Sequence, residues 1–184
     1  MKPISRKTTW IIWIAIFIPY MYVANVVMPN IQRDIKAIAD KPECAKALDI
    51  MMFGISMDAA EKSLTCMGEE GRMVYRSAEK LQDSIYPALY TLFFVFTLFS
   101  LGSYVFGGKK FYVYLLLIPF LGMAFDFYEN HLIVNFIDQF PELSNSTIWS
   151  LSLANSIKWL LAFSNILMVL VFAVLSLIKV IKNR

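Results

Sequence analysis

The chain has 184 residues, of which 58% are hydrophobic and 15% aromatic, and its formal net charge is only +3. This composition, with a mean hydropathy of +0.58, lies outside the range of soluble domains and carries no basic footprint for nucleic acid. The chain is therefore expected to be an integral membrane protein that does not bind nucleic acid.

Four stretches of the sequence are long and apolar enough to cross a bilayer as helices. A hydrocarbon core of about 30 Å requires roughly 20 helical residues. The predicted membrane spans are residues 8–28, 84–106, 111–137 and 149–178. The predicted fold class is all-α, with residues 1–184 forming one integral membrane domain built as a four-helix bundle.

The lysines and arginines of the short segments predict the orientation of the chain in the membrane. The tail before the first span and the tail after the fourth each carry three of them, and the turn between the second and third spans carries Lys109 and Lys110. Residues 138–148 carry none. Because cytoplasmic segments are enriched in these residues, both termini are expected in the cytoplasm, with the multi-pass chain in a bacterial inner membrane.

Residues 30–83 form the longest segment outside the predicted spans. Apolar residues recur in it at helical steps of three and four, at Ala45, Leu48, Met52 and Ile55. Ser56 is a candidate N-cap for a following helix, and residues 68–84 are predicted to form a helix that continues into the second span. We expect a small helical extracytoplasmic cap, which is too short to have much core of its own and leans on the bundle or is stapled.

The two cysteines of the chain, Cys44 and Cys66, both lie in this segment. A disulfide is expected because disulfides persist on the extracytoplasmic side, and closing a loop of about 20 residues contributes ~3 kcal/mol. The alternatives are two free buried thiols, or soft-metal binding together with nearby methionines. Those methionines are Met51, Met52, Met57, Met67 and Met73.

The third span contains polar residues that do not suit contact with lipid. Asp126, Glu129, Asn130 and His131, the only histidine, lie inside this apolar stretch. At about 1.5 Å per residue, they lie in the outer third of the membrane. At about 100° per residue, Asp126, Glu129 and Asn130 share one face with Gly122, where a neighbouring helix is expected to come close, whereas His131 points away from that face.

The other spans carry polar residues at a similar depth. They are Asn25, Tyr86, Tyr90, Asn155 and Lys158, with Asp83 just above them. An ionisable group at the bilayer centre costs several kcal/mol when it faces lipid. We therefore expect the polar faces of all four spans to converge on the interior of the bundle.

The cluster of Asp126, Glu129, Asn130 and Lys158 has two interpretations. In the structural one, Lys158 pairs with a carboxylate and Asn130 bonds across helices, so that the cluster fixes helix register. In the functional one, two acids and one lysine leave a charge unpaired unless Arg72 reaches down from the cap or one acid stays protonated. Such groups are typical of functional sites.

The leading functional hypothesis is a binding module for a lipid-like ligand or for a partner's transmembrane helix. Tyrosines would supply its walls, and Asp126, Glu129 and Lys158 would hold a head group, with Arg72 available for an anionic one. The predicted ligand-binding residues are Asp126, Glu129, Asn130, Lys158, Tyr86, Tyr90, Asp83, Arg72 and Asn155. Expected partners are membrane lipids, another membrane protein or a second copy of the chain.

The alternative hypothesis is an intramembrane enzyme that acts on a lipidic substrate. One carboxylate would be the general base, and the other carboxylate or a tyrosine would be the acid. The candidate catalytic residues are Asp126, Glu129 and Tyr86. The sequence contains no metal-ligand set, phosphate-binding loop or nucleophile–histidine pair, so neither a metal nor a cofactor is expected.

Three stretches of the sequence resemble a set of uncharacterised small bacterial four-span inner-membrane proteins. The stretches are GEEGRMVYRSAEKLQDSIYPALY, IPFLGMAFDFYENHLI and SIKWLL, and they extend over roughly residues 69–162. The shared pattern of GR-x-x-Y, D-x-x-Y-P-x-x-Y, D-x-x-E-N and a late lysine implies candidate positions at Arg72, Tyr75, Asp83, Tyr86, Pro87, Tyr90, Asp126, Glu129, Asn130 and Lys158. The layout of four spans with a long first outer loop is also similar, at the level of fold alone, to the emopamil-binding sterol isomerase and sigma-2 receptor group. Neither resemblance implies an activity.

Overall fold

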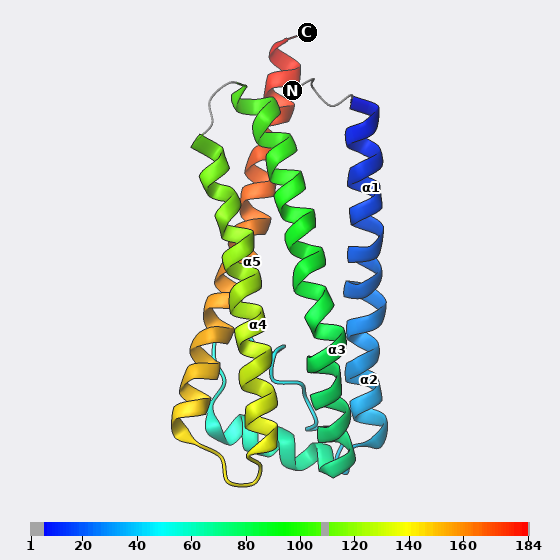
Figure 1. Ribbon diagram of the computed structural model, residues 1–184, viewed down its shortest axis with the longest axis vertical. Coiled ribbons are helices and arrows are strands. Elements are labelled where there is room, and N and C mark those ends of the chain that lie inside the picture. The colour runs from blue at the N-terminus through cyan, green and yellow to red at the C-terminus, as the bar shows by residue number, and fades with distance from the viewer. Residues whose placement is uncertain (1–5, 108–110, 184) are drawn as a thin grey trace.

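The computed structural model describes residues 6–107 and 111–183 and has four long helical segments along its long axis (Figure 1). The described residues contain no β-strand, so the predicted all-α fold is confirmed. The start of the first helix and the end of the last lie at one end of the bundle, which we call the terminal end (Figure 1). The opposite end, which we call the cap end, holds the segment between the first two long helices and the turn between the last two (Figure 1).

The helical elements in chain order are α1 (Arg6–Tyr22), the π-helical turn η1 (Val23–Val27), α2 (Met28–Ile38), α3 (Met57–Phe106), the 3-10 turn η2 (Phe111–Leu116), α4 (Leu117–Asp138) and α5 (Asn145–Lys182). Four helical stretches are long and apolar enough to span a membrane, namely Lys7–Ile38, Met57–Phe106, Phe111–Asp138 and Asn145–Lys182. Each contains one predicted span, so the chain has the layout of a multi-pass membrane protein.

The orientation of these spans relative to a membrane stays a prediction. Four of the basic residues on which it depends lie outside the described residues, namely Lys2, Lys109, Lys110 and Arg184. The beginning of α1 and the end of α5 do lie at the same end of the bundle (Figure 1). This arrangement is the one that the prediction of two termini on the same side requires.

The long helix α3 begins after a capping serine and bends at a glycine. Ser56 is its N-cap, because the Ser56 hydroxyl accepts a hydrogen bond of 3.2 Å from the Ala59 amide, as predicted. Gly68 interrupts the helix with a φ of 68° and a ψ of −179°. A Cβ at Gly68 would lie 2.6 Å from Oδ2 of Asp40, so both the backbone angle and the close contact require glycine.

Residues 39–56, which we call the plug, are not helical, so the helical prediction for residues 45–55 is wrong. Phe53 and Gly54 have positive φ values of 59° and 118°, which a right-handed helix does not contain. The expected cap is therefore an irregular segment followed by the cap-end part of α3. Its position outside the membrane stays a prediction.

Cys44 of the plug and Cys66 of α3 form a disulfide, with their Cα atoms 5.7 Å apart. The predicted disulfide is confirmed, and the alternatives of free thiols or thiolate metal ligands are excluded because both sulfur atoms are bonded. The amide of Lys41 also donates a hydrogen bond of 2.9 Å to the carbonyl of Cys66. These contacts fasten the plug to α3 just before the kink.

Apolar residues hold the bundle together inside and cover it outside. The larger core cluster lies at the cap end and joins the plug to the helices through fully buried residues such as Leu48 and Leu151. A smaller cluster at the terminal end contains Leu98, Tyr112 and Phe172. The outward faces of α1 and α5 are strongly apolar as well, with exposed residues at Ile14, Ile18, Leu167 and Leu170. An exposed apolar surface of this kind is typical of helices that face lipid.

Candidate functional site

A cavity of about 560 Å³ lies inside the bundle next to the plug. Residues of α1, η1, α2, the plug, α3, α4 and α5 line it, so every predicted span contributes to its wall. Tyr20, Tyr86, Tyr90 and Phe94 supply aromatic surface. The charged lining residues are Asp49, Glu79, Asp83, Asp126 and Lys158. Lysine is thus present once in a lining that otherwise carries only acidic charges.

Lys158 lies at the centre of a buried charge cluster. Its Nζ forms an ion pair with Glu129 and lies 3.7 Å from Oδ1 of Asp126. Glu129 is completely buried, and its Oε1 accepts a hydrogen bond of 2.7 Å from Nδ2 of Asn155. Lys158 therefore compensates two carboxylates, and each oxygen of Glu129 has a partner.

The spacing of these residues along their helices explains why they meet. Asp126, Glu129 and Asn130 lie within about one turn on one face of α4, and all three are buried. Asn155 and Lys158 are separated by three positions on α5, which places them on one face of that helix. The polar faces of α4 and α5 converge on the interior of the bundle.

Contacts between α3 and α4 fix the register of these helices beside the cavity. Nδ2 of Asn130 donates a hydrogen bond of 3.0 Å to the backbone carbonyl of Asp83. The hydroxyl of Tyr90 interacts with the carboxylate of Asp126. The rings of Tyr86 and Tyr90 lie 5.4 Å apart, so the two tyrosines form a continuous wall.

Asp49 connects the plug to α5 and to α3. Its backbone carbonyl accepts hydrogen bonds from the side chains of Asn155 and Lys158, both at 3.4 Å, and from Nε1 of Trp159 at 3.2 Å. Its carboxylate accepts a hydrogen bond of 2.8 Å from the hydroxyl of Tyr75. A single plug residue is thus joined to the buried charge cluster and to the second span.

Side chains of α2 and α3 take the place of backbone hydrogen bonds within the plug. Gln32 donates to the carbonyl of Ala45 at 3.1 Å and accepts from the amide of Ala47 at 2.8 Å. The hydroxyl of Ser63 accepts from the amide of Lys46 at 2.9 Å. Because buried backbone groups need hydrogen-bond partners, these contacts explain how the plug stays irregular despite the helical spacing of its apolar residues.

Most of the predicted site residues lie at the cavity. Those that line it are Asp83, Tyr86, Tyr90, Asp126 and Lys158. Glu129, Asn130 and Asn155 are buried behind the lining and contact it through the ion pair and hydrogen bonds described above. The structure therefore separates residues that can touch a ligand from residues that position them.

Arg72 does not take its predicted place beside the carboxylates. Its Nη1 donates a hydrogen bond of 3.0 Å to the carbonyl of Leu64, and its guanidinium lies 4.2 Å from the centroid of the Phe140 ring. These contacts hold Arg72 at the cap end and outside the cavity lining. His131 is exposed, with Nε2 3.0 Å from Nδ2 of Asn135, in line with its predicted position off the polar face.

Gly122 borders the cavity and is not required by a close helix contact. A Cβ at this position would lie 3.7 Å from the Tyr90 hydroxyl and 3.8 Å from Nδ2 of Asn165, which are ordinary contact distances. Leu161 of α5 does come close to Gly122, as expected, with its Cβ 3.8 Å from such a Cβ, but not so close that glycine is required. Its missing side chain instead leaves free volume in the cavity.

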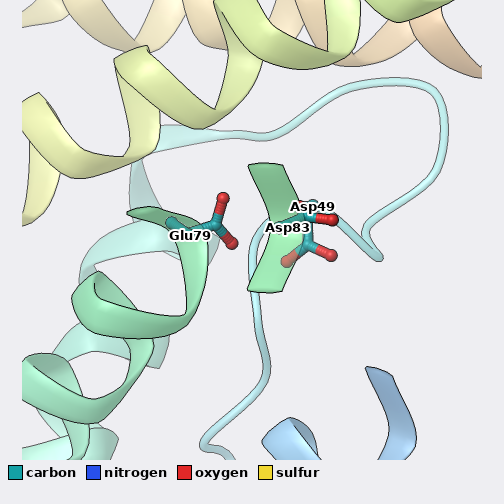
Figure 2. A group of neighbouring side chains, drawn as sticks. All are labelled: Asp49, Glu79 and Asp83. Carbon is teal, nitrogen blue, oxygen red and sulfur yellow. The ribbon is translucent and has the colours of Figure 1, made fainter. Parts of the chain in front are cut away.

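Glu79, Asp49 and Asn165 also line the cavity, although none of them was assigned to the site from the sequence. Glu79 lies four positions before Asp83 on α3, so helical spacing could have found it. Asp49 belongs to the irregular plug and gave no periodic signal. The carboxylates of Asp49, Glu79 and the predicted Asp83 converge, with one oxygen of each within 4.8 Å of the others (Figure 2). Asn165 is 1% exposed, and neither of its amide atoms has a hydrogen-bond partner within the described part of the chain.

The lining of the cavity has the chemistry to hold an amphiphilic molecule, because polar groups lie beside aromatic and apolar walls. Asp126 accepts hydrogen bonds, Lys158 donates them, and the amide of Asn165 can do both. No known family model, curated protein or solved structure matches the chain, so its function is inferred from this geometry.

Proposed function

We propose that this protein is a membrane module that binds a lipid-like ligand in the cavity between its four spans. The observation that carries the proposal is the cavity, which combines tyrosine walls with buried charges inside a bundle whose outer surface is apolar. Small-molecule pockets typically measure roughly 300–1,000 Å³. A cavity of about 560 Å³ falls within that range.

The ligand would enter the cavity from the bilayer between the first long helix and α5. The backbones of these helices do not approach closely, because no Cα atom of α1 or α2 lies within 8 Å of one in α5. Both helices nevertheless line the cavity, with Ala24 and Met28 on one side and Ala162 and Ile166 on the other. Ile166 is 47% exposed, so the lining reaches the outer surface there. A ligand that is dissolved in the membrane can therefore enter sideways.

Asp126, Lys158 and Asn165 would make the polar contacts with the head group. Asp126 and Lys158 line the cavity, whereas Glu129 lies behind them, pairs with Lys158 and is itself held by Asn155. The unpartnered amide of Asn165 offers one more donor and one more acceptor. The tyrosines and the apolar lining residues would contact the rest of the ligand.

We also infer a bacterial inner-membrane location, with both termini in the cytoplasm and the cap end outside it. The distribution of basic residues supports this orientation. The disulfide supports it as well, because the bond joins two cap-end residues and disulfides persist outside the cytoplasm.

Membrane lipids are better supported as partners than a helix of another protein or a second copy of this chain. Polar and small residues form a stripe along α5 that could in principle serve a helix contact, namely Ser152, Asn155, Lys158, Ala162 and Asn165. Its asparagines, Asn155 and Asn165, are buried inside the bundle, so the stripe is already used within this chain.

An intramembrane enzyme that acts on a lipidic substrate is the alternative function. The observation in its favour is that Asp126 and Tyr86 line the same cavity, where a carboxylate base and a phenol acid could both reach a substrate. Glu129, another candidate catalytic residue, does not line the cavity and is held by Lys158 and Asn155. Turnover of a bound lipid by the wild type, and its loss in Asp126→Asn, would establish this alternative.

Native mass spectrometry with lipid analysis tests the proposed binding. The protein would be extracted gently from its own membrane as the wild type, as Asp126→Asn and as Glu142→Gln, a control at an exposed acidic residue of the α4–α5 turn. We expect one class of lipid-like molecule to be retained by the wild type and by the control, and to be lost from Asp126→Asn. Equal retention by all three proteins, or no specific retention by the wild type, would contradict the proposal.

A further inference from the structure

A second group of buried acids lies where the plug meets α3. Asp49 comes from the plug, and Glu79 and Asp83 come from successive turns of α3. One carboxylate oxygen of each lies within 4.8 Å of the others, and Figure 2 shows Glu79 reaching towards the two aspartates. Glu79 and Asp83 are only 3% and 4% exposed. Glu79 and Asp83 are thus almost completely buried, Asp49 is half-buried as a residue, and the three acids meet at the wall of the cavity.

The buried carboxylate of Glu79 is not satisfied by the protein. Oε2 of Glu79 is buried and has no hydrogen-bond partner within the described residues. In the same part of the chain, no lysine, arginine or histidine forms an ion pair with Asp49, Glu79 or Asp83, and Lys158 pairs with Asp126 and Glu129 instead. A buried charge without a partner is strongly unfavourable. A bound cation or protons would relieve the repulsion between these acids, because the ion pairs of Lys158 are made with Asp126 and Glu129.

The surroundings of the three acids hold them in place. Oδ1 of Asp49 accepts a hydrogen bond from Tyr75, and the Tyr75 oxygen in turn accepts one of 2.8 Å from the Leu48 amide. Asn130 fixes the backbone at Asp83 through its hydrogen bond of 3.0 Å to that carbonyl. Supporting hydrogen bonds that orient carboxylates are characteristic of metal sites.

We propose that Asp49, Glu79 and Asp83 bind a hard divalent cation of the Ca²⁺ or Mg²⁺ class. The ligand set consists of carboxylate oxygens, which such ions prefer, and it contains neither histidine nor thiolate. A dication would offset the repulsion between the three acids and give Oε2 of Glu79 a partner. These three ligands are not the residues that pair with Lys158, although both groups line the same cavity, and the site revises the expectation from the sequence that no metal is bound.

The cation would connect the plug to the second span. Asp49 is the only plug residue among the three ligands, so the bound ion would add a link between the plug and α3 beside the disulfide. Anything that binds the folded state alone stabilises it in proportion to the logarithm of its concentration. We therefore expect the cation to raise the melting temperature of the protein.

Calorimetric titration of the full chain in detergent, after treatment with a chelator, tests this site. Ca²⁺ and Mg²⁺ would be titrated separately into the wild type, into Glu79→Gln and into two controls. One control, Asp58→Asn, removes an exposed acid of α3, and the other, Glu142→Gln, removes an exposed acid of the α4–α5 turn. We expect about one ion per wild-type chain, roughly tenfold or greater weakening in Glu79→Gln, and binding close to wild type in both controls.

Two results would overturn the proposal. One is a wild type that binds neither ion at concentrations up to about 10 mM, beyond the usual range of such sites. The other is a Glu79→Gln protein that binds as tightly as the wild type. If Glu79→Gln does not fold, Asp83→Asn takes its place with the same expected loss. A wild type that binds no ion, together with a higher melting temperature for either variant, would mean that protons balance these acids and no metal does.

Discussion

The cap end and the terminal end of the bundle are built from the same helices in different ways. At the cap end, α3, α4 and α5 enclose buried charges, the plug and a cavity. At the terminal end they meet through aromatic rings, with the Phe106 ring 5.9 Å from that of Tyr112 and 5.3 Å from that of Phe172. Gly102 lies so close to Tyr112 that a Cβ would be 2.4 Å from the ring.

This difference indicates that the terminal end mainly stabilises the bundle, whereas the cap end provides the space and the polar groups for a ligand. Close apolar packing holds the helices at the terminal end, with a few hydrogen bonds such as those of Lys179 and Ser103 beside it. At the cap end, polar groups are buried where packing leaves space for a ligand, and intramembrane ionisable groups of this kind are typical of functional sites. Substitutions at the two ends should therefore have different effects on stability and on binding.

The largest expected effect comes from removing the lysine of the buried charge cluster. Lys158→Ala leaves Asp126 and Glu129 without a counter-charge, and breaking a buried ion pair in this way costs about 3–5 kcal/mol. Thermal unfolding in detergent should show a large drop in melting temperature.

Lys179→Ala is the matched control at the terminal end. The Lys179 ammonium group is half-buried, donates hydrogen bonds to two backbone carbonyls of α3 and lies 5.2 Å from the centroid of the Tyr104 ring. Because it pairs with no buried carboxylate, its loss should cost only about 1–2 kcal/mol. Equal drops in melting temperature for the two lysine variants would contradict the contrast between the ends.

A smaller effect is expected from removing the disulfide at the cap end. The bond joins residues that are 22 positions apart, and in a protein with Cys44→Ser and Cys66→Ser its loss should cost ~3 kcal/mol. A reducing agent should lower the melting temperature of the wild type to about that of the double variant, and it should leave the melting temperature of the double variant unchanged. A wild type that is insensitive to reduction would show that the disulfide does not hold the plug.

The smallest effects come from the same substitution at two glycines. Gly102→Ala forces a Cβ against the Tyr112 ring, and such overpacking costs about 1–3 kcal/mol. Gly122→Ala meets only ordinary contacts beside the cavity and gains up to ~1 kcal/mol of helix propensity. The melting temperatures of the two variants test this difference. A larger drop in melting temperature for Gly122→Ala than for Gly102→Ala would argue against free space at Gly122.

Much of the fold could be predicted because its signals are local. The four spans follow from the length of the apolar stretches, and the polar face of α4 follows from the helical spacing of Asp126, Glu129 and Asn130. The disulfide followed from the presence of just two cysteines, both in the segment that was expected outside the cytoplasm. In each case the residues involved carry the pattern themselves.

The remaining features depend on contacts between distant segments. The plug has helical spacing at Ala45 and Leu48, but Gln32 and Ser63 take its backbone hydrogen bonds, and no local pattern reports that competition. Asp49 lines the cavity because it belongs to this irregular plug, so no local pattern predicted its position either. Charge balance offered Arg72 as one of two ways to compensate the acids, the other being a protonated acid, but a carbonyl and an aromatic ring at the cap end hold Arg72 elsewhere.

Photolabelling with a diazirine-bearing phospholipid, mapped by mass spectrometry, tests the central claim of a lipid-binding cavity most directly. We expect labels at the cavity residues Ala162 and Asn165 as well as on the outer face of α1 at Ile14. Gly122→Leu, which fills the cavity beside Asn165, should abolish the cavity labels and leave the label at Ile14 unchanged. Labels confined to the outer face of the wild type, or cavity labels that persist in Gly122→Leu, would contradict the account.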